Sequence, residues 1–192
     1  MAKKFIIGID EVGRGPLAGP VAVCALCLNS GFNTKSFKDF RDSKKLSHLQ
    51  RVKWLEKINF EKENGNLTYK VSLESNKVID KKGLTFAINK ALENSLKFLN
   101  KNPKDCLVLL DGGLKAPIEY RNQKTIIKGD EKELAIALAS IVAKVQRDTL
   151  LTNLARKYPG YGFEKHKGYG TKEHYKALKN KGISPIHRLR FL

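Results

Sequence analysis

Short apolar runs in the first half of the chain have the length and β-branched composition of strands. They cover residues 4–9, 20–28 and 67–73, and in the last of these apolar and polar positions alternate. Strict alternation is typical of a strand with one buried face. Ser47 and Gln50 have the spacing of a capping box, which predicts a helix beginning there. The positions of this helix expected to face inward are Leu49, Val52, Leu55 and Ile58.

A second set of elements follows the same two periods. A helical stripe of apolar residues runs from Leu84 to Leu99, and apolar runs at 106–110 and 125–127 predict two further strands. Apolar positions at helical spacing predict a long helix over 131–156. Thr171 is placed to cap one more short helix. Strands and helices in this order predict an α/β fold, a mixed sheet flanked by helices.

The composition of the chain indicates a polyanionic partner. The chain of 192 residues carries 37 Lys and Arg against 19 Asp and Glu, a net charge of +18. Such an excess favours nucleic acid or another anionic surface. The length suits a single domain over 1–192, in which 157–192 forms a basic C-terminal part rich in Lys, His, Tyr and Gly.

Nothing in the chain predicts secretion or a membrane span. The apolar run after the basic N-terminus stops at Asp10, and no apolar stretch reaches transmembrane length. Cys24 and Cys27 are three apart on an expected strand, so they face opposite ways and cannot share one metal. The three cysteines are therefore interpreted as small buried apolar residues, and the predicted location is the cytoplasm.

Acidic residues follow three of the expected strands. Asp10 and Glu11 end the first apolar run, Asp111 ends the run at 106–110, and Asp130 lies between a strand and a helix. Loops at strand ends are where α/β folds place their chemistry, so the four are expected to converge. Oxygen ligands without His or Cys suit Mg²⁺ or Mn²⁺. Two alternatives stay open: Asp130 as a helix N-cap, and Asp148 as a member of a structural ion pair.

The loop after Asp10 and Glu11 lets main chain approach another molecule, because Arg14 stands between Gly13 and Gly15. The spacing also matches part of a dinucleotide-binding fingerprint. That motif needs a helix beginning in the loop, and Pro16, Gly19 and Pro20 prevent one.

Taken together, these segments resemble bacterial ribonuclease HII, the type 2 ribonuclease H family. The similarity covers nearly the whole chain through motifs in the same order. They are Gly8 to Pro20, Asp42-Ser43-Lys44-Lys45-Leu46-Ser47, Leu110-Asp111-Gly112, Lys128-Gly129-Asp130, Ala139 to Asp148, and Tyr161 to Tyr169.

The resemblance implies an RNase H-like mixed sheet with a small C-terminal helical region. It implies an endonuclease that hydrolyses RNA in RNA/DNA hybrids and cuts DNA 5′ of embedded ribonucleotides, leaving 3′-hydroxyl and 5′-phosphate ends. The metal-site acids would be Asp10, Glu11, Asp111 and Asp130, with Mn²⁺ or Mg²⁺. The substrate-binding residues would be Gly13, Arg14, Gly15, Tyr169, Ser43, Lys44 and Lys144. The resemblance also favours a monomer.

The close alternative to this resemblance is the type 3 sister family. That family carries an additional N-terminal domain and lacks this Gly-Arg-Gly form, and here the first strand is expected at residue 4. Leu138 and Arg190 depart from the residues usual in the type 2 family. The first is interpreted as a packing difference, and the second leaves the role of the C-terminal end open.

A nucleic-acid-binding module without catalysis would suit the basic segment 158–175, since aromatic rings stack on bases and Lys contacts phosphate. It does not explain acids at strand ends. His166 and His174 are interpreted as solvated or phosphate-contacting residues rather than a zinc site, because no cysteine is near.

Overall fold

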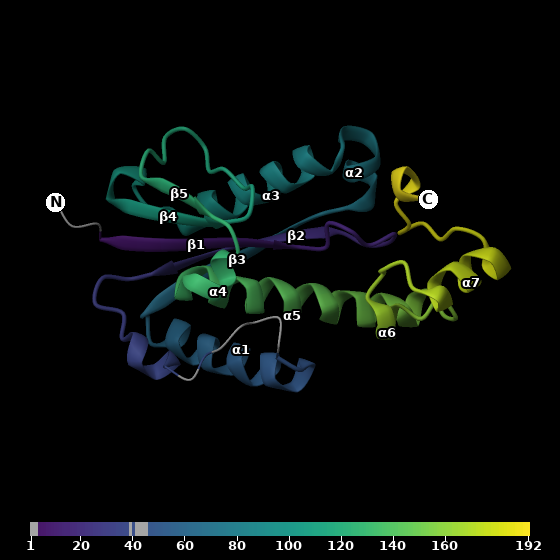
Figure 1. Ribbon diagram of the computed structural model, residues 1–192, viewed down its shortest axis with the longest axis horizontal. Helices are drawn as coiled ribbons and strands as arrows, with labels where there is room; N and C mark the ends of the chain where they lie inside the picture. The colour runs from purple at the N-terminus through teal and green to yellow at the C-terminus, as the bar shows by residue number, and fades with distance from the viewer. Residues whose placement is uncertain (1–3, 39, 41–45) are drawn as a thin grey trace.

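A five-stranded mixed sheet forms the centre of the computed structural model, which describes residues 4–38, 40 and 46–192 (Figure 1). The strand order is β3-β2-β1-β4-β5. β1 pairs antiparallel with β2 and parallel with β4, β2 pairs antiparallel with β3, and β4 pairs parallel with β5. The bounds are β1 Phe5–Val12, β2 Val21–Leu28, β3 Leu67–Glu74, β4 Cys106–Asp111 and β5 Gln123–Ile126.

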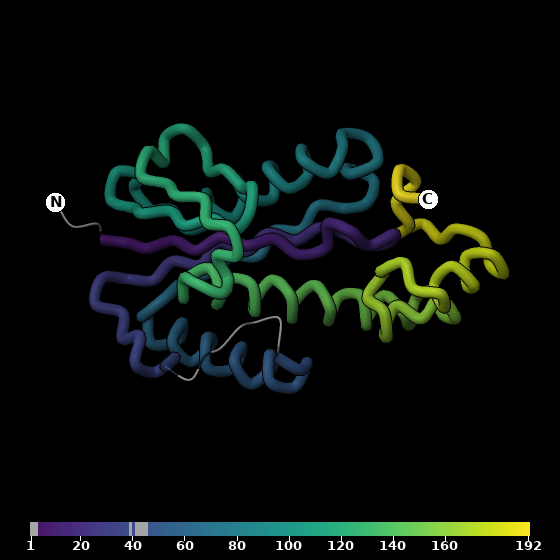
Figure 2. Tube along the Cα trace, viewed as in Figure 1, coloured from purple at the N-terminus to yellow at the C-terminus, as the bar shows by residue number. Residues whose placement is uncertain are grey.

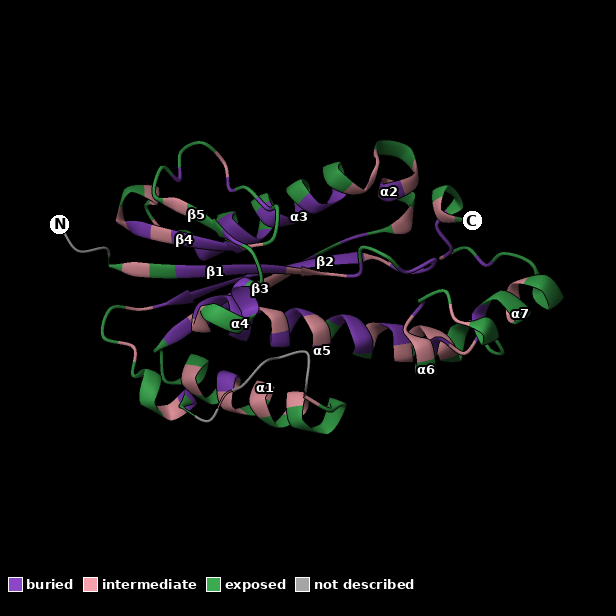
Figure 3. Cartoon of the chain, viewed as in Figure 1, coloured by how far each residue is buried: buried purple, intermediate pink, exposed green. Residues whose placement is uncertain are grey.

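Helices cover both faces of this sheet (Figure 1). α2 (Asn76–Lys82) and α3 (Leu84–Leu99) lie on one face, and α1 (His48–Glu63) and α5 (Leu134–Lys157) lie on the other. β2 is buried along its whole length between the two layers (Figure 3). The mixed sheet with flanking helices that the sequence predicted is therefore confirmed.

The two faces of β2 belong to two different apolar cores. Val23 and Cys27 pack with α3, whereas Cys24 and Leu26 pack with α1 and α5. The period of two that follows from a pleated strand accounts for this division. It also confirms that Cys24 and Cys27 face opposite ways, and both are buried free thiols.

The start of α5 lies directly against β1. A Cβ atom at Gly8 would stand 2.1 Å from the main-chain carbon of Ala135, so only glycine allows this contact. The close approach brings Ser140 of α5 within hydrogen-bonding reach of Asp10 on β1. Helix packing on a glycine thus sets the position of an acidic side chain.

The helix predicted over 131–156 is two helices. α4 (Gly129–Lys132) is a single turn, Glu133 is extended with φ −125° and ψ 117°, and α5 begins at Leu134. The expected single helix is wrong at this point, because hydrophobic spacing does not register one extended residue. Asp130 consequently lies in the short helix and not at the start of the long one.

The C-terminal region turns back onto the loop after β1 (Figure 2). α6 (Phe163–His166) and α7 (Lys172–Lys181) form the small helical part, and the chain returns so that His187 pairs with Ala18 in an isolated bridge. Short 3₁₀ turns occupy η1 Thr34–Phe37, η3 Pro103–Asp105 and η4 Leu189–Phe191. A small C-terminal helical region was predicted and is confirmed.

The structure confirms some of the local predictions for helices and contradicts others. The capping box at Ser47 and Gln50 is present with both of its hydrogen bonds, at 2.8 and 3.3 Å. Leu49, expected to face inward, is 74% exposed because it lies on the outer side of the first turn of α1. α2 was not predicted. No helix in the described part of the chain could cross a bilayer.

Candidate active site

Two neighbouring parallel strands bring three carboxylates together. Asp10 and Glu11 lie within β1, which extends to Val12, and Asp111 is the last residue of β4. The register pairs Ile9 with Leu110, so Asp10 and Asp111 fall side by side at the carboxyl ends of the two strands. This is the edge of the sheet at which the sequence placed them.

Burial makes these acids interact strongly. Asp10 is 7% exposed. Burial above all, then the charges of Glu11 and Asp111, raises its pKa to about 8, although a hydrogen bond with Ser140 opposes the shift. Burial also raises the pKa of Glu11. Positive charge at this point would relieve both, since ionised carboxylates in a poorly solvated site repel each other.

Glu11 has one oxygen occupied and one without a partner. Its Oε1 accepts a hydrogen bond from Arg14 at 3.1 Å, while Oε2 is buried and no described residue donates to it. A buried acceptor without a donor is costly unless a cation or water satisfies it. Together with Asp10 and Asp111, it supplies the oxygen-only donors that Mg²⁺ and Mn²⁺ prefer.

The acids nevertheless do not form a finished metal cage. Among the described residues, no three His, Cys, Asp or Glu side chains are grouped closely enough to hold an ion. The chemistry of the donor atoms, carboxylate oxygens without His or Cys, nevertheless fits a divalent cation.

Asp130, the fourth acid, is buried in the single turn of α4. It is 3% exposed and lines a cavity of about 320 Å³ between α4 and η1, whereas Asp10 and Glu11 line a different cavity. Its neighbour Gly129 donates its N–H to Asp111 Oδ1 at 2.7 Å, which ties α4 to the end of β4. This contact joins the residue before Asp130 to one of the other acids, Asp111.

The cavity at Asp10 and Glu11 is lined by acidic, basic and aromatic side chains. It measures about 230 Å³ and is completed by a set of residues from β1, α1, α5 and the loop after α6. These are Val12, Arg51, Ser140, Ile141, Lys144 and Tyr169. A negatively charged backbone entering here would meet lysine and arginine as well as carboxylates.

Lys144 and Tyr169 are neighbours in this wall. The Lys144 Nζ lies 5.8 Å from the centre of the Tyr169 ring and 3.0 Å from an oxygen of Asp148. Asp148 is therefore in the structural ion pair that was expected. Tyr169 is 38% exposed, so part of the residue remains accessible to a ligand.

Gly13, Arg14 and Gly15 form the loop beside that ring. Arg14 and Gly15 are exposed, and a Cβ at Gly15 would come within 4.0 Å of the Tyr169 ring. Gly13 is buried with φ +94°, and a Cβ there would stand 2.3 Å from Arg147 Nε. Glycine at 13 is required by both its conformation and its contact.

Some expected residues fall elsewhere. Ser43 and Lys44 lie outside the described residues. His174 is fully buried, so its interpretation as solvated or phosphate-contacting is wrong. Its ring nitrogens bond to Tyr169 O at 2.9 Å and to His187 Nε2 at 3.0 Å. His187 is buried beside it, and no local signal in the sequence predicts the burial of these two histidines.

Arg51 and Ser140 line the cavity but were not predicted. Ser140 lies in a motif that carried the family resemblance, which was the available signal. Arg51 follows an ordinary capping box, and only the packing of α1 beside α5 brings it to the cavity. Both are brought in by tertiary structure.

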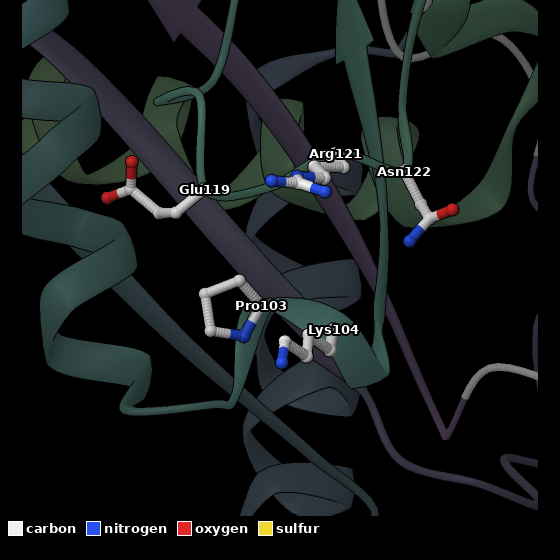
Figure 4. A pocket seen from close by; sticks show the side chains of 5 residues that line it. All are labelled: Pro103, Lys104, Glu119, Arg121 and Asn122. Atoms are coloured by element: carbon white, nitrogen blue, oxygen red, sulfur yellow. The ribbon is translucent and has the colours of Figure 1, made fainter.

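A larger cavity of about 470 Å³ lies at the other end of β4 (Figure 4). Pro103, Lys104, Glu119, Arg121 and Asn122 line it. Pro103 and Lys104 precede the first residue of β4, Cys106, whereas Asp111 is its last residue. The length of β4 therefore separates this cavity from the acids. It holds one acid and offers no comparable chemistry.

Comparison with known proteins agrees with this geometry. The family model described as Ribonuclease HII matches residues 7–192. The ribonuclease HII of Caldicellulosiruptor bescii is 44% identical over 189 residues, covering 98% of this chain and 87% of that protein. The ribonuclease HII of Fusobacterium nucleatum subsp. nucleatum is 45% identical over 192 residues, covering 98% and 86%.

A solved structure extends the likeness to the fold. The crystal structure of the ribonuclease H2 from Pyrococcus horikoshii OT3 has a TM-score of 0.69 and 27% identity, covering 96% of this chain and 92% of that chain. The RNase H-like fold and the type 2 resemblance expected from the sequence are confirmed.

Proposed function

Since this chain belongs to the ribonuclease HII family, we propose that it hydrolyses the RNA strand of RNA/DNA hybrids and cuts duplex DNA at embedded ribonucleotides. The cut falls on the 5′ side of the ribonucleotide and leaves 3′-hydroxyl and 5′-phosphate ends. The observation that carries the proposal is one cavity lined by Asp10 and Glu11 together with Lys144 and Tyr169. It combines acids for catalysis with groups that bind nucleic acid.

Asp10, Glu11 and Asp111 would hold the divalent cation, Mg²⁺ or Mn²⁺, and Asp130 would join them from α4. When bound, the cation supplies water activation and neutralises charge on the leaving oxygen. Ser140 fixes the orientation of Asp10 through its hydrogen bond. The unpartnered Glu11 Oε2 is a buried oxygen that a cation would satisfy.

The basic wall would bind the phosphate backbone. Lys144 stands beside the acids, and its ion pair with Asp148 holds its chain in place at 3.0 Å. Lys and Arg that contact phosphates position a nucleic acid without reading its sequence. Ser43 and Lys44, from the segment before α1, are proposed as further contacts on the basis of the family motif.

Ribonucleotide recognition would come from the loop and the ring. A 2′-hydroxyl both donates and accepts hydrogen bonds, so main-chain groups at Gly13-Arg14-Gly15 can distinguish it from a deoxyribose. Tyr169 lies against Gly15 and offers a ring face to the adjacent sugar. A sugar bound beside both would be contacted by the loop and by the ring.

The test is cleavage of three labelled substrates: a hybrid, a duplex with one ribonucleotide, and an all-DNA duplex. With Mg²⁺ or Mn²⁺ the first two are cut and the third is not, and a chelator stops both reactions. A protein that binds all three equally and cuts none would be a binding module instead. Activity as a monomer and a cytoplasmic location remain predictions.

A further inference from the structure

Arg188, from the returning C-terminal segment, lies buried beneath the proposed ribonucleotide-reading loop. Its side chain is 0% exposed. Its guanidinium donates to three main-chain oxygens: Gly19 at 2.9 Å, Arg14 at 3.0 Å and Gly13 at 2.7 Å. No described carboxylate forms an ion pair with it, so these carbonyl dipoles are what compensate the buried charge.

These bonds fix the direction of two peptide groups. In a trans peptide the C=O and the following N–H point opposite ways. Holding the oxygens of Gly13 and Arg14 toward Arg188 therefore turns the N–H groups of Arg14 and Gly15 away from it. Arg14 and Gly15 are exposed, and no described acceptor takes either N–H group. The loop thus presents two free donors on the side away from Arg188.

A second buried arginine joins this loop to the one that carries Tyr169. Arg147 of α5 donates to Pro20 O at 2.9 Å, Ala18 O at 3.3 Å and Lys167 O at 3.1 Å. Leu17 N–H also donates to Gly168 O at 2.8 Å. The two loops are therefore held to each other as well as to the core.

A chain of hydrogen bonds connects the same C-terminal segment to Tyr169. Ser184 N–H donates to His187 Nδ1 at 2.8 Å, so that nitrogen has no proton and Nε2 carries it. His187 Nε2 then donates to His174 Nε2 at 3.0 Å, which leaves His174 Nδ1–H to donate to Tyr169 O at 2.9 Å. Only neutral rings with these tautomers satisfy all three bonds.

The segment is itself fastened to the opposite layer of the molecule. Asn76, at the start of α2, donates to Pro185 O at 3.0 Å and to His187 O at 2.8 Å, and Asp80 accepts from Arg190 N–H at 3.2 Å. Figure 2 shows the yellow C-terminal end lying beside the purple loop after β1. The segment is hydrogen-bonded to α2 on one side and to the loop after β1 on the other, so its position is fixed.

We propose that Arg188 is a positioning residue for ribonucleotide recognition: it holds the Gly13 and Arg14 carbonyls so that the N–H groups of Arg14 and Gly15 face the substrate sugar beside Tyr169. This rests on the proposed function. It gives the C-terminal end a role that the sequence left open, and it assigns that role to Arg188 rather than to Arg190.

The test compares Arg188→Met with Arg190→Met, the same change two residues away at an exposed position. On a duplex with one ribonucleotide, Arg188→Met lowers kcat/KM at least tenfold and Arg190→Met leaves it near the parent value. Leu92→Ala, a core change on α3 far from the loop, controls for lost stability. It lowers the melting temperature, and at a temperature where it remains folded it cleaves like the parent.

A double variant separates positioning from general damage. If Arg188 acts by positioning the Gly13–Gly15 loop beside Tyr169, adding Arg188→Met to Tyr169→Ala lowers kcat/KM less than threefold further. A full, independent tenfold loss in that background overturns the proposal, as does a folded Arg188→Met with parental kinetics.

If Arg188→Met does not fold, Arg188→Lys replaces it under the same criteria. Lysine keeps the charge but cannot span three carbonyls with one nitrogen, so cleavage falls below the parent. Parental cleavage by a folded Arg188→Lys overturns the proposal. A parent protein that cuts none of the ribonucleotide substrates contradicts the proposed function instead, so the two failures are distinguishable.

Discussion

At the scale of single residues, the site contains carboxyl groups whose surroundings disfavour their ionised form. Asp10 is a carboxyl with a pKa raised to about 8 by burial and neighbouring acids, and Glu11 keeps an oxygen without a partner. Perturbed groups gathered in one cavity are typical of functional sites. Each is explained if a cation shares the site during catalysis.

Asp10→Asn therefore removes a metal oxygen while keeping the size of the side chain. We expect cleavage to fall at least about 100-fold, the scale seen when one stabilising group is lost at a developing charge. Substrate binding, measured by fluorescence anisotropy in chelator, stays within a few-fold. Asp105→Asn, at the other end of β4, is the control and cleaves like the parent. Asp10→Asn with nearly parental activity would remove Asp10 from the metal site.

Tyr169 tests recognition in the same way. Tyr169→Ala removes both the ring face and the hydroxyl, and cleavage at a single embedded ribonucleotide is expected to fall by about tenfold or more, since stacking is worth roughly 1–3 kcal/mol per base. Tyr169→Phe keeps the ring and part of the activity. Phe98→Ala removes another exposed aromatic, on α3, and serves as the control with melting curves for each variant. Equal cutting by Tyr169→Ala and Phe98→Ala contradicts the assignment.

At the scale of elements, the sequence predicted the strands well because their periods are local. The first strand, the buried β2 and the alternating β3 were each placed within a few residues. The break at Glu133 was missed because one extended residue hardly changes the hydrophobic spacing, and the burial of His174 was missed because it depends on tertiary packing. The burial of Arg147 and Arg188 was not predicted either. Their guanidinium groups bond to main-chain carbonyls, and such contacts leave no pattern of charged residues in the sequence.

The His174–His187 pair predicts a pH dependence for the C-terminal segment. Burial, then the neighbouring His174, lowers the pKa of His187 to about 4. The unfolded chain, with a pKa near 6.5, binds the proton first, so stability falls as pH drops from about 6.5 to about 4. The shift corresponds to a loss of up to about 3 kcal/mol.

Chemical denaturation across this pH range measures the effect. His187→Gln can still accept from Ser184 and donate to His174, and its free energy of unfolding should depend less on pH. His48→Gln, on the exposed first turn of α1, keeps the parental slope and is the control. An identical slope in His187→Gln would show that this histidine titrates normally in the folded protein.

At the scale of the whole molecule, a net charge of +18 surrounds a small acidic site. The charge attracts a polyanion, and the carboxylates restrict close approach to a point where a cation can stand between them and phosphate. Electrostatic attraction of this kind is strongly salt-dependent. Affinity for nucleic acid should therefore fall steeply as salt is added.

Lys144 allows this to be measured at one contact. In Lys144→Ala, the slope of log affinity against log salt becomes shallower by about 1, as expected for one lost phosphate contact. Lys90→Ala is a matched control, because Lys90 is also paired with a buried carboxylate, Glu74, at 3.0 Å, but lies on the opposite face of the sheet. The same slope in both variants would place Lys144 outside the interface.

The central claim is that this site finds a 2′-hydroxyl and cuts beside it. The direct measurement uses a series of end-labelled duplexes, each with one ribonucleotide, moved stepwise along an otherwise unchanged DNA sequence. The account predicts a single Mn²⁺- or Mg²⁺-dependent cut that moves with the ribonucleotide, always on its 5′ side, with 3′-hydroxyl and 5′-phosphate ends. A cut that stays at one sequence position, or one that also appears in the all-DNA duplex, would contradict it.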